Sequence, residues 1–258
     1  MKNSMEYLKE LHAQDKIIED ILNLKEFVEI LDKDVKDKNS NVLIENNMLI
    51  HDNINGGYLK NLKLQFSGEI GDKINIKLLK MVGKINITNE FIVESNKWFN
   101  YIKDNEGKIT YLNTYSYNKV EKCNEIIVHD IKKYIETLLE IDWILRNYES
   151  SDIEYDSLGK MIHRNNIKNF NKYSEYFEFF RQINDIDNSY KHSIVNDRMT
   201  FLGIEKNCII VIESKKEKNM QKIYEGKQEL YYLLDDMIKQ FNDFFKFSID
   251  NINKIKIF

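Results

Sequence analysis

The chain has 258 residues, of which 42% are hydrophobic and 31% are charged, so it can build a folded core and is not a disordered chain. It contains no proline, which excludes collagen-like and proline-rich sequences. Its formal net charge of −4 argues against a protein dedicated to wrapping DNA, because such proteins usually carry a basic excess.

Residues 4–37 are predicted to form a long helix. Apolar residues recur there at alternating steps of four and three, from Ile17 to Val35. Such a seam suits either a coiled-coil dimer arm or a helix that packs on its own chain. The flanking charges are not clearly complementary, which favours packing on the same chain.

Residues 38–120 change character, because glycines become frequent and the apolar period falls toward two. Apolar and polar residues alternate at positions 62–66, 74–78, 85–87 and 109–111. This alternation predicts several short strands in a small antiparallel sheet. Residues 73–82 also fit a helix, since one helical face would hold Ile74, Leu78 and Met81.

The C-terminal half is predicted to be a four-helix bundle. Helical apolar stripes occupy residues 121–149, 156–167, 171–194 and the segment from Leu230 to Phe244, and an apolar β-branched run at Cys208–Ile212 predicts an inserted strand. The expected fold is therefore α+β. Residues 1–120 form a region with a long N-terminal helix and a small antiparallel sheet, and residues 121–258 form the helical bundle.

One polar stripe on the third of these bundle helices is a candidate for chemistry. At 100° per residue, four different polar side chains fall within about 60° of one another: Arg181, Asp185, Asn188 and His192. His192 can transfer a proton near neutral pH, Asn188 can hold a phosphate oxygen or the imidazole, and Asp185 can fix the imidazole tautomer. Arg181 and Lys191 can stabilise a developing negative charge. Arg181 and His192 lie about 16 Å apart along a straight helix, so within one chain they cannot both contact the same substrate atom.

A helical bundle whose late helix carries Asn188-x-x-x-His192 resembles the HEPN family, over at most residues 121–252. In this resemblance His192 matches the motif histidine, and Asn188 or Asp187 matches the polar residue after the motif arginine. The arginine itself has no counterpart at residues 185–187. The resemblance implies a metal-independent endoribonuclease that works as a homodimer, without a cofactor, in bacterial defence or toxin–antitoxin systems.

Two alternatives accompany this interpretation. His192 can simply be stabilised at a helix C-terminus while Arg181 and Asp185 form an ordinary ion pair. The protein would then be a non-catalytic helical bundle that acts as a sensor or binds another protein through an apolar patch on residues 42–120. His163 and Arg164 either add positive charge to the His192 cleft, as substrate-binding residues, or form an exposed helix end.

The remaining signals concern metals and the compartment. His12, His51 and His129 lack partners at metal-ligand spacing, so no metal site is expected. Glu136, Glu140 and Asp142 are interpreted as a solvated helix face. The chain begins with a charged segment, holds two isolated cysteines and contains no run of about 18 apolar residues. These features predict a cytoplasmic protein without a membrane span. RNA as a partner is implied by the resemblance to the HEPN family alone.

Overall fold

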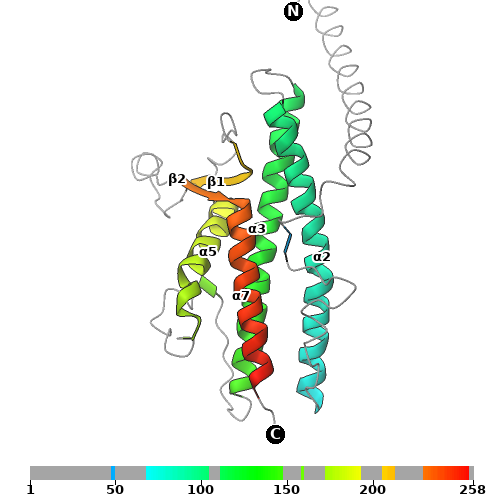
Figure 1. Cartoon of the computed structure of the whole chain (residues 1–258), viewed down its shortest axis with the longest axis vertical. Helices are drawn as coiled ribbons and strands as arrows, with labels where there is room; N and C mark the ends of the chain where they lie inside the picture. Colours follow the sequence, from blue (N-terminus) through cyan, green and yellow to red (C-terminus); the bar gives the residue numbers. More distant parts are fainter. Residues whose placement is uncertain are drawn as a thin grey trace, which may run out of the picture. The chain divides into compact units, whose positions relative to one another are not determined.

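The computed structural model describes residues 48–49, 68–104, 111–147, 158–159, 172–192, 205–212 and 229–255 (Figure 1). Apart from residues 111–112, these residues belong to one compact unit made of residues 47–109 and 113–258. Its elements, in chain order, are α2 (Gly68–Asp104), α3 (Tyr111–Arg146), α5 (Phe177–His192), β1 (Cys208–Ile212), β2 (Glu229–Leu233) and α7 (Leu234–Lys254). The helix expected at residues 4–37 lies outside the described residues.

Helix α2 corrects the expectation of a sheet in this region. The strands expected at residues 74–78 and 85–87 are both part of this one helix, and Tyr111 begins α3 rather than lying in a strand. The buried residues follow the helical period instead, with Ile74, Leu78, Met81 and Ile85 all in the core. The helical alternative for residues 73–82 is therefore confirmed. The strand expected at residues 62–66 lies outside the described residues.

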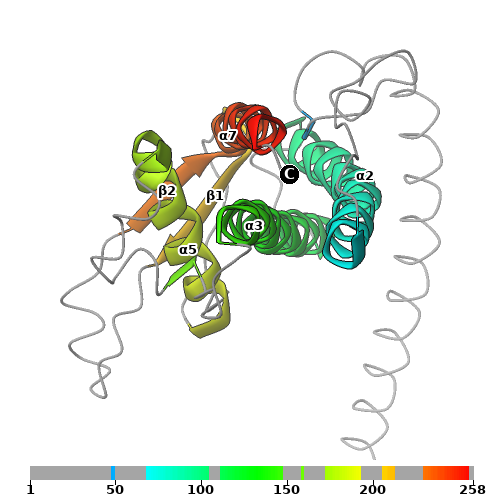
Figure 2. The same cartoon turned by 90° about the horizontal axis from the view of Figure 1, so that it is seen from below.

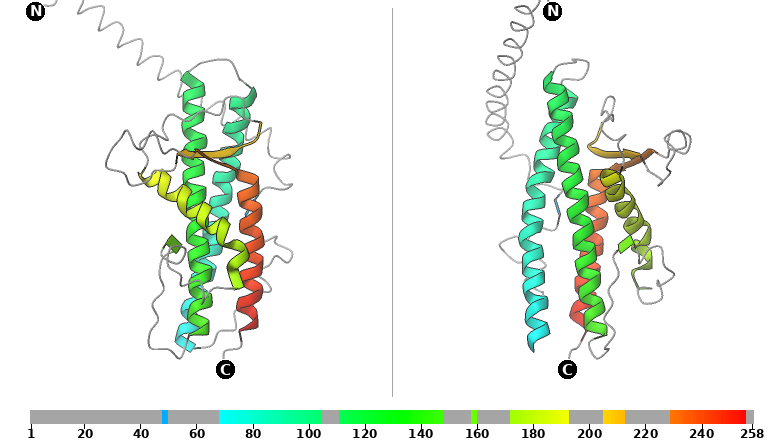
Figure 3. Two further views of the ribbon diagram at one scale, coloured as in Figure 1. Left: turned by 90° about the vertical axis from the view of Figure 1, so that its left-hand side faces the viewer. Right: turned by 180° about the vertical axis from the view of Figure 1, so that it is seen from behind.

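The core is built where α2, α3 and α7 run alongside one another (Figures 1 and 3). Helix α3 supplies its central stripe and runs without a break past residues 120 and 121. Tyr134 on α3 packs against Phe241 on α7 with ring centroids 5.9 Å apart, and its hydroxyl lies 2.6 Å from Thr88 Oγ1 on α2. Tyr134 thus joins the three helices through one buried side chain.

Helix α5 lies across this layer and packs on α7 near the two strands (Figure 2). Phe180 meets Phe244 of α7 edge to face at 4.9 Å. The expected helix over 171–194 is confirmed in its main part, since α5 covers Phe177–His192 and residues 172–176 form a 3₁₀ turn before it. Of the short helix expected at 156–167, the structure describes residues 158–159, which are helical.

The strands β1 and β2 pair antiparallel, in a register that joins Cys208 to Leu233 and Ile212 to Glu229. Strand β1 occupies the residues predicted for it. Strand β2 was not predicted, and Leu230, expected in the last helix, belongs to it. Helix α7 then starts at Leu234, immediately after the strand. The described fold is thus mostly helical with one small antiparallel sheet.

A two-residue segment, Met48–Leu49, is fixed between α2 and α7. The Leu49 N–H donates to Asn89 Oδ1 at 2.9 Å, and Asn89 Nδ2 donates to the Leu49 carbonyl at 3.2 Å. From the other side, Asn242 Nδ2 of α7 donates to the Met48 carbonyl at 2.9 Å. The Leu49 side chain is fully buried in the core.

Candidate functional site

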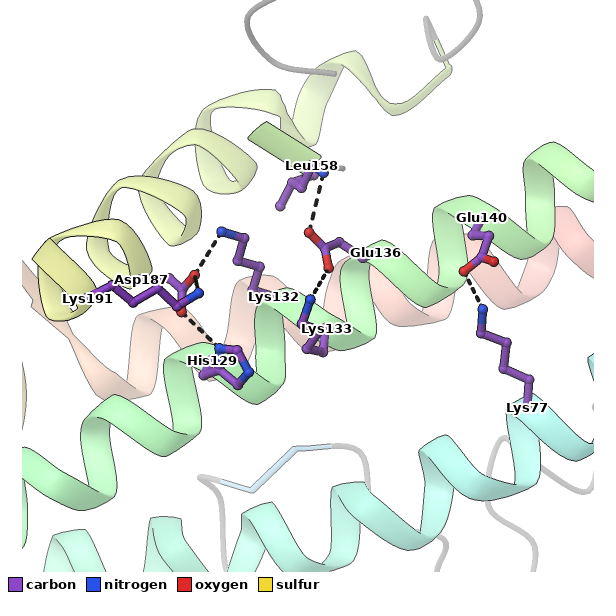
Figure 4. A network of polar contacts seen from close by, with 9 residues as sticks. All are labelled: Lys77, His129, Lys132, Lys133, Glu136, Glu140, Leu158, Asp187 and Lys191. Carbon is purple, nitrogen blue, oxygen red and sulfur yellow. Dashed lines mark hydrogen bonds and ion pairs between the residues drawn. The ribbon is translucent and has the colours of Figure 1, made fainter. Parts of the chain in front are cut away.

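A buried carboxylate on α5 organises the polar contacts between α5 and α3. Asp187 follows the buried Ile183 and Ile186 on the face that α5 turns inward, and its side chain is only 3% exposed. Its Oδ1 lies 3.0 Å from His129 Nδ1, and its Oδ2 accepts hydrogen bonds from Lys132 Nζ at 2.8 Å and Lys191 Nζ at 2.5 Å (Figure 4). We call these four residues the Asp187 cluster.

The two helices supply the cluster through ordinary helical spacing. His129 and Lys132 lie one turn apart on α3, and Lys191 lies one turn after Asp187 on α5, so both pairs share a helix face. The side chains of His129 and Lys191 are each 44% exposed, whereas that of Lys132 is 10% exposed. The cluster therefore has a buried anchor and an edge that solvent reaches.

The charges of the cluster keep Asp187 ionised. Burial alone would raise the pKa of this carboxyl, but the hydrogen bonds from Lys132, Lys191 and His129 outweigh burial and hold the pKa at about 2. A buried carboxylate at neutral pH is tolerable only with such partners. The cluster thus places a permanent negative charge beside one imidazole and two ammonium groups.

This depressed pKa predicts an acid-sensitive contribution to stability. Because the pKa of Asp187 is lower in the folded than in the unfolded chain, its contribution is complete above pH 4 and is lost as pH falls toward 2. We expect about 2 kcal/mol of unfolding free energy to disappear over that interval. Urea titrations at pH 5, 4, 3 and 2 measure it, and in Asp187→Asn this part of the pH dependence should be absent.

The geometry suits proton transfer next to an anion. With Nδ1 of His129 against the carboxylate, the ring is oriented and Nε2 is left to give or take a proton. Nothing in the described part of the chain bonds to Nε2. The half-exposed ammonium of Lys191 shares the same carboxylate, so it can also face a negatively charged ligand.

The expected stripe on α5 lies largely outside this cluster. Arg181 is exposed and donates to Glu178 Oε2 at 2.7 Å, so the expected ion pair with Asp185 is wrong. Asp185 is half-buried and accepts a long hydrogen bond from Asn184 at 3.4 Å, and Asn188 is exposed. Of the residues expected to take part, the structure brings two into the cluster: Lys191, and Asp187, which was the alternative to Asn188 as the polar residue of the motif.

The structure does not describe the side chains of three of the expected site residues. His192 is the last residue of α5, directly after Lys191, and its side chain lies outside the described residues. His163 and Arg164 lie outside them altogether. Their roles stay predictions.

Sequence reasoning missed His129 and Lys132. Both lie on α3, and Lys132 directly follows the fully buried Ile131. The available signal was a charged residue within an apolar stripe on each helix: Lys132 among the isoleucines of α3, and Asp187 directly after Ile186 on α5. Such charges are buried only when paired, so the two stripes together predict an ion pair.

Another acidic residue also departs from its expected place. Asp142 was expected on a solvated face, but it is buried and its Oδ1 accepts hydrogen bonds from Lys172 and from Arg146 Nε, the latter at 3.2 Å. Cys123 and Cys208 are both buried and form no disulfide, and burial raises the pKa of Cys123 to about 11. Neither thiol is therefore placed for nucleophilic chemistry.

No protein-family model, curated protein or solved structure matches the chain. Over the described ranges, no three histidine, cysteine, aspartate or glutamate residues are grouped so that they would hold a metal ion. The helices described here also include none with the length and apolar character needed to cross a membrane.

Proposed function

We propose that this protein cleaves RNA by acid–base catalysis at the exposed edge of the Asp187 cluster. The observation that carries the proposal is the half-exposed imidazole of His129, held by the buried carboxylate of Asp187 beside the ammonium of Lys191. RNA suits these groups, because its 2′-hydroxyl needs only a base and its phosphate needs a nearby positive charge. The resemblance to the HEPN family supports the same substrate and a role in bacterial defence.

The proposed reaction uses the substrate's own nucleophile. His129 Nε2 takes the proton of the 2′-hydroxyl, the 2′-oxygen forms a bond to the adjacent phosphorus, and the bond from phosphorus to the 5′-oxygen breaks. Lys191 stabilises the charge on the phosphate oxygens. The leaving 5′-oxygen takes a proton from a second acid, for which His192, next to Lys191, stays our candidate. The products are a 2′,3′-cyclic phosphate and a 5′-hydroxyl.

Cleavage of a fluorescent RNA in buffer with EDTA tests this proposal. We expect His129→Gln to reduce the cleavage rate at least about 100-fold, because general acid–base groups contribute that much or more. Lys133→Gln is the matched control, since this exposed side chain on the same helix pairs with Glu136 and should leave the rate within about twofold. The proposal fails if the wild type does not cleave RNA, or if folded His129→Gln cleaves it normally.

The second candidate function is a non-catalytic bundle that binds another protein. It is favoured by two exposed isoleucines, Ile76 and Ile87, which are 51% and 53% exposed and lie three turns apart on one face of α2. This location falls within the region, residues 42–120, where such a patch was expected. A wild-type protein without RNA cleavage, whose association with a partner is lost in Ile76→Asp with Ile87→Asp, would favour this second function.

A further inference from the structure

A second surface runs along the seam between α5 and α7, and its lining includes no residue of the Asp187 cluster. A cavity of about 260 Å³ lies beside β2, and one of about 530 Å³ lies toward the C-terminal part of α7. Phe179 and Gln240 line both cavities, so the two lie next to each other along the same seam. We call them together the α5–α7 groove.

The groove has an aromatic floor and an acidic rim. Its lining includes the partly buried rings of Tyr176 and Phe247, which pack against each other at 5.4 Å, and the buried ring of Phe179. Around them stand four carboxylates: Glu175, Asp236, Asp243 and Asp250. Among the described residues that line the groove, Lys246 alone is basic. A ligand that fits must therefore be positively charged and partly apolar.

Five of the seven residues of α7 that line the groove follow a seven-residue repeat. They are separated by steps of four, three, four and three: Asp236, Gln240, Asp243, Phe247 and Asp250. The other two, Met237 and Lys246, each lie next to a member of this row. This spacing keeps residues on one seam facing a second helix, as in a left-handed coiled coil. The seam from Asp236 to Asp250 is about 21 Å long, which matches four turns of a helix.

We infer that the α5–α7 groove docks a basic amphipathic α-helix of a partner protein. Lysines or arginines at every seventh position of that helix would face Asp236, Asp243 and Asp250, and apolar residues between them would cover the aromatic floor. Cationic side chains also bind favourably over aromatic rings. The aromatic floor and the acidic rim of the groove therefore both favour a partner with positively charged side chains. A flexible polyamine or an extended basic peptide would satisfy the charge but not the repeat along α7.

A labelled synthetic 21-residue helical peptide with Leu and Lys in heptads tests this inference by fluorescence anisotropy. We expect the wild type to bind it, and Asp243→Lys with Asp250→Lys to bind at least about tenfold more weakly, because attraction becomes repulsion. The matched control reverses two exposed charges on α2, Glu90→Lys with Asp104→Lys, and should bind like the wild type. RNA cleavage should be the same in both double variants, which separates this test from that of the proposed function.

Other outcomes would overturn the inference. Equal binding of a scrambled peptide of the same composition would show that charge alone is recognised, without the seven-residue repeat. Competition by spermidine at micromolar concentration would identify a small polycation as the ligand. Sedimentation that shows self-association lost in Asp243→Lys with Asp250→Lys would identify a second copy of this chain as the occupant. Absence of peptide binding to the wild type would also contradict the inference.

Discussion

Asp187→Ala should lower the free energy of unfolding by about 3–5 kcal/mol, because breaking a buried ion pair leaves its partner charged without compensation. The partner left unpaired is Lys132, since its side chain is 10% exposed and its ammonium donates a hydrogen bond to Asp187 at 2.8 Å. Urea denaturation at pH 7, followed by circular dichroism, measures the loss. We expect a lower midpoint with an unchanged slope.

Two further variants show whether burial causes the effect. Lys191→Ala removes a half-exposed partner of the same carboxylate and should cost at most about 1 kcal/mol. Asp187→Leu combined with Lys132→Met removes both buried charges and should recover most of the lost stability, because an apolar pair of similar volume is often equivalent. A loss below about 1 kcal/mol in Asp187→Ala would mean that the carboxylate is not buried as described.

Phe244→Ala should also lower the free energy of unfolding by about 3–5 kcal/mol, because it leaves a cavity among three other aromatic rings. The Phe244 ring is fully buried on α7 and lies 4.9 Å from Phe180, 5.4 Å from Tyr176 and 5.8 Å from Tyr173. Thermal and urea denaturation measure the loss. Phe247→Ala removes the same side chain at a partly buried position one turn later on α7, and it should cost clearly less. Equal losses would contradict this description of the core.

Helices are predicted correctly from the sequence where all of their apolar residues face the core. The prediction is wrong where a helix also carries exposed apolar residues. In α2, Ile76 and Ile87 are exposed, and together with the buried Ile74, Leu78 and Ile85 they create an alternating pattern typical of strands. Strand β2 was missed for a different reason. Leu230 and Leu234 are four residues apart, which imitates a helix start, while the strand depends on pairing with β1, a nonlocal contact.

The candidate site was predictable in part. Lys191 and the helix that carries it were expected from the α5 pattern. The contact between Asp187 and His129 was not, because 58 residues separate them and no local spacing relates the two. The expected stripe from Arg181 to His192 lies on the polar side of the helix, whereas the buried charge on the inward side organises the described contacts.

The Met48–Leu49 segment makes the join between α2 and α7 depend on a third part of the chain. Asn89 on one helix and Asn242 on the other hold the main chain of the same two residues, whose leucine fills the core between them. Parting the helices would deprive these backbone groups of at least one of the two asparagines and expose the leucine to water. Separation of α2 from α7 therefore costs the hydrogen bonds and the burial of a third segment as well as the direct contact of the two helices.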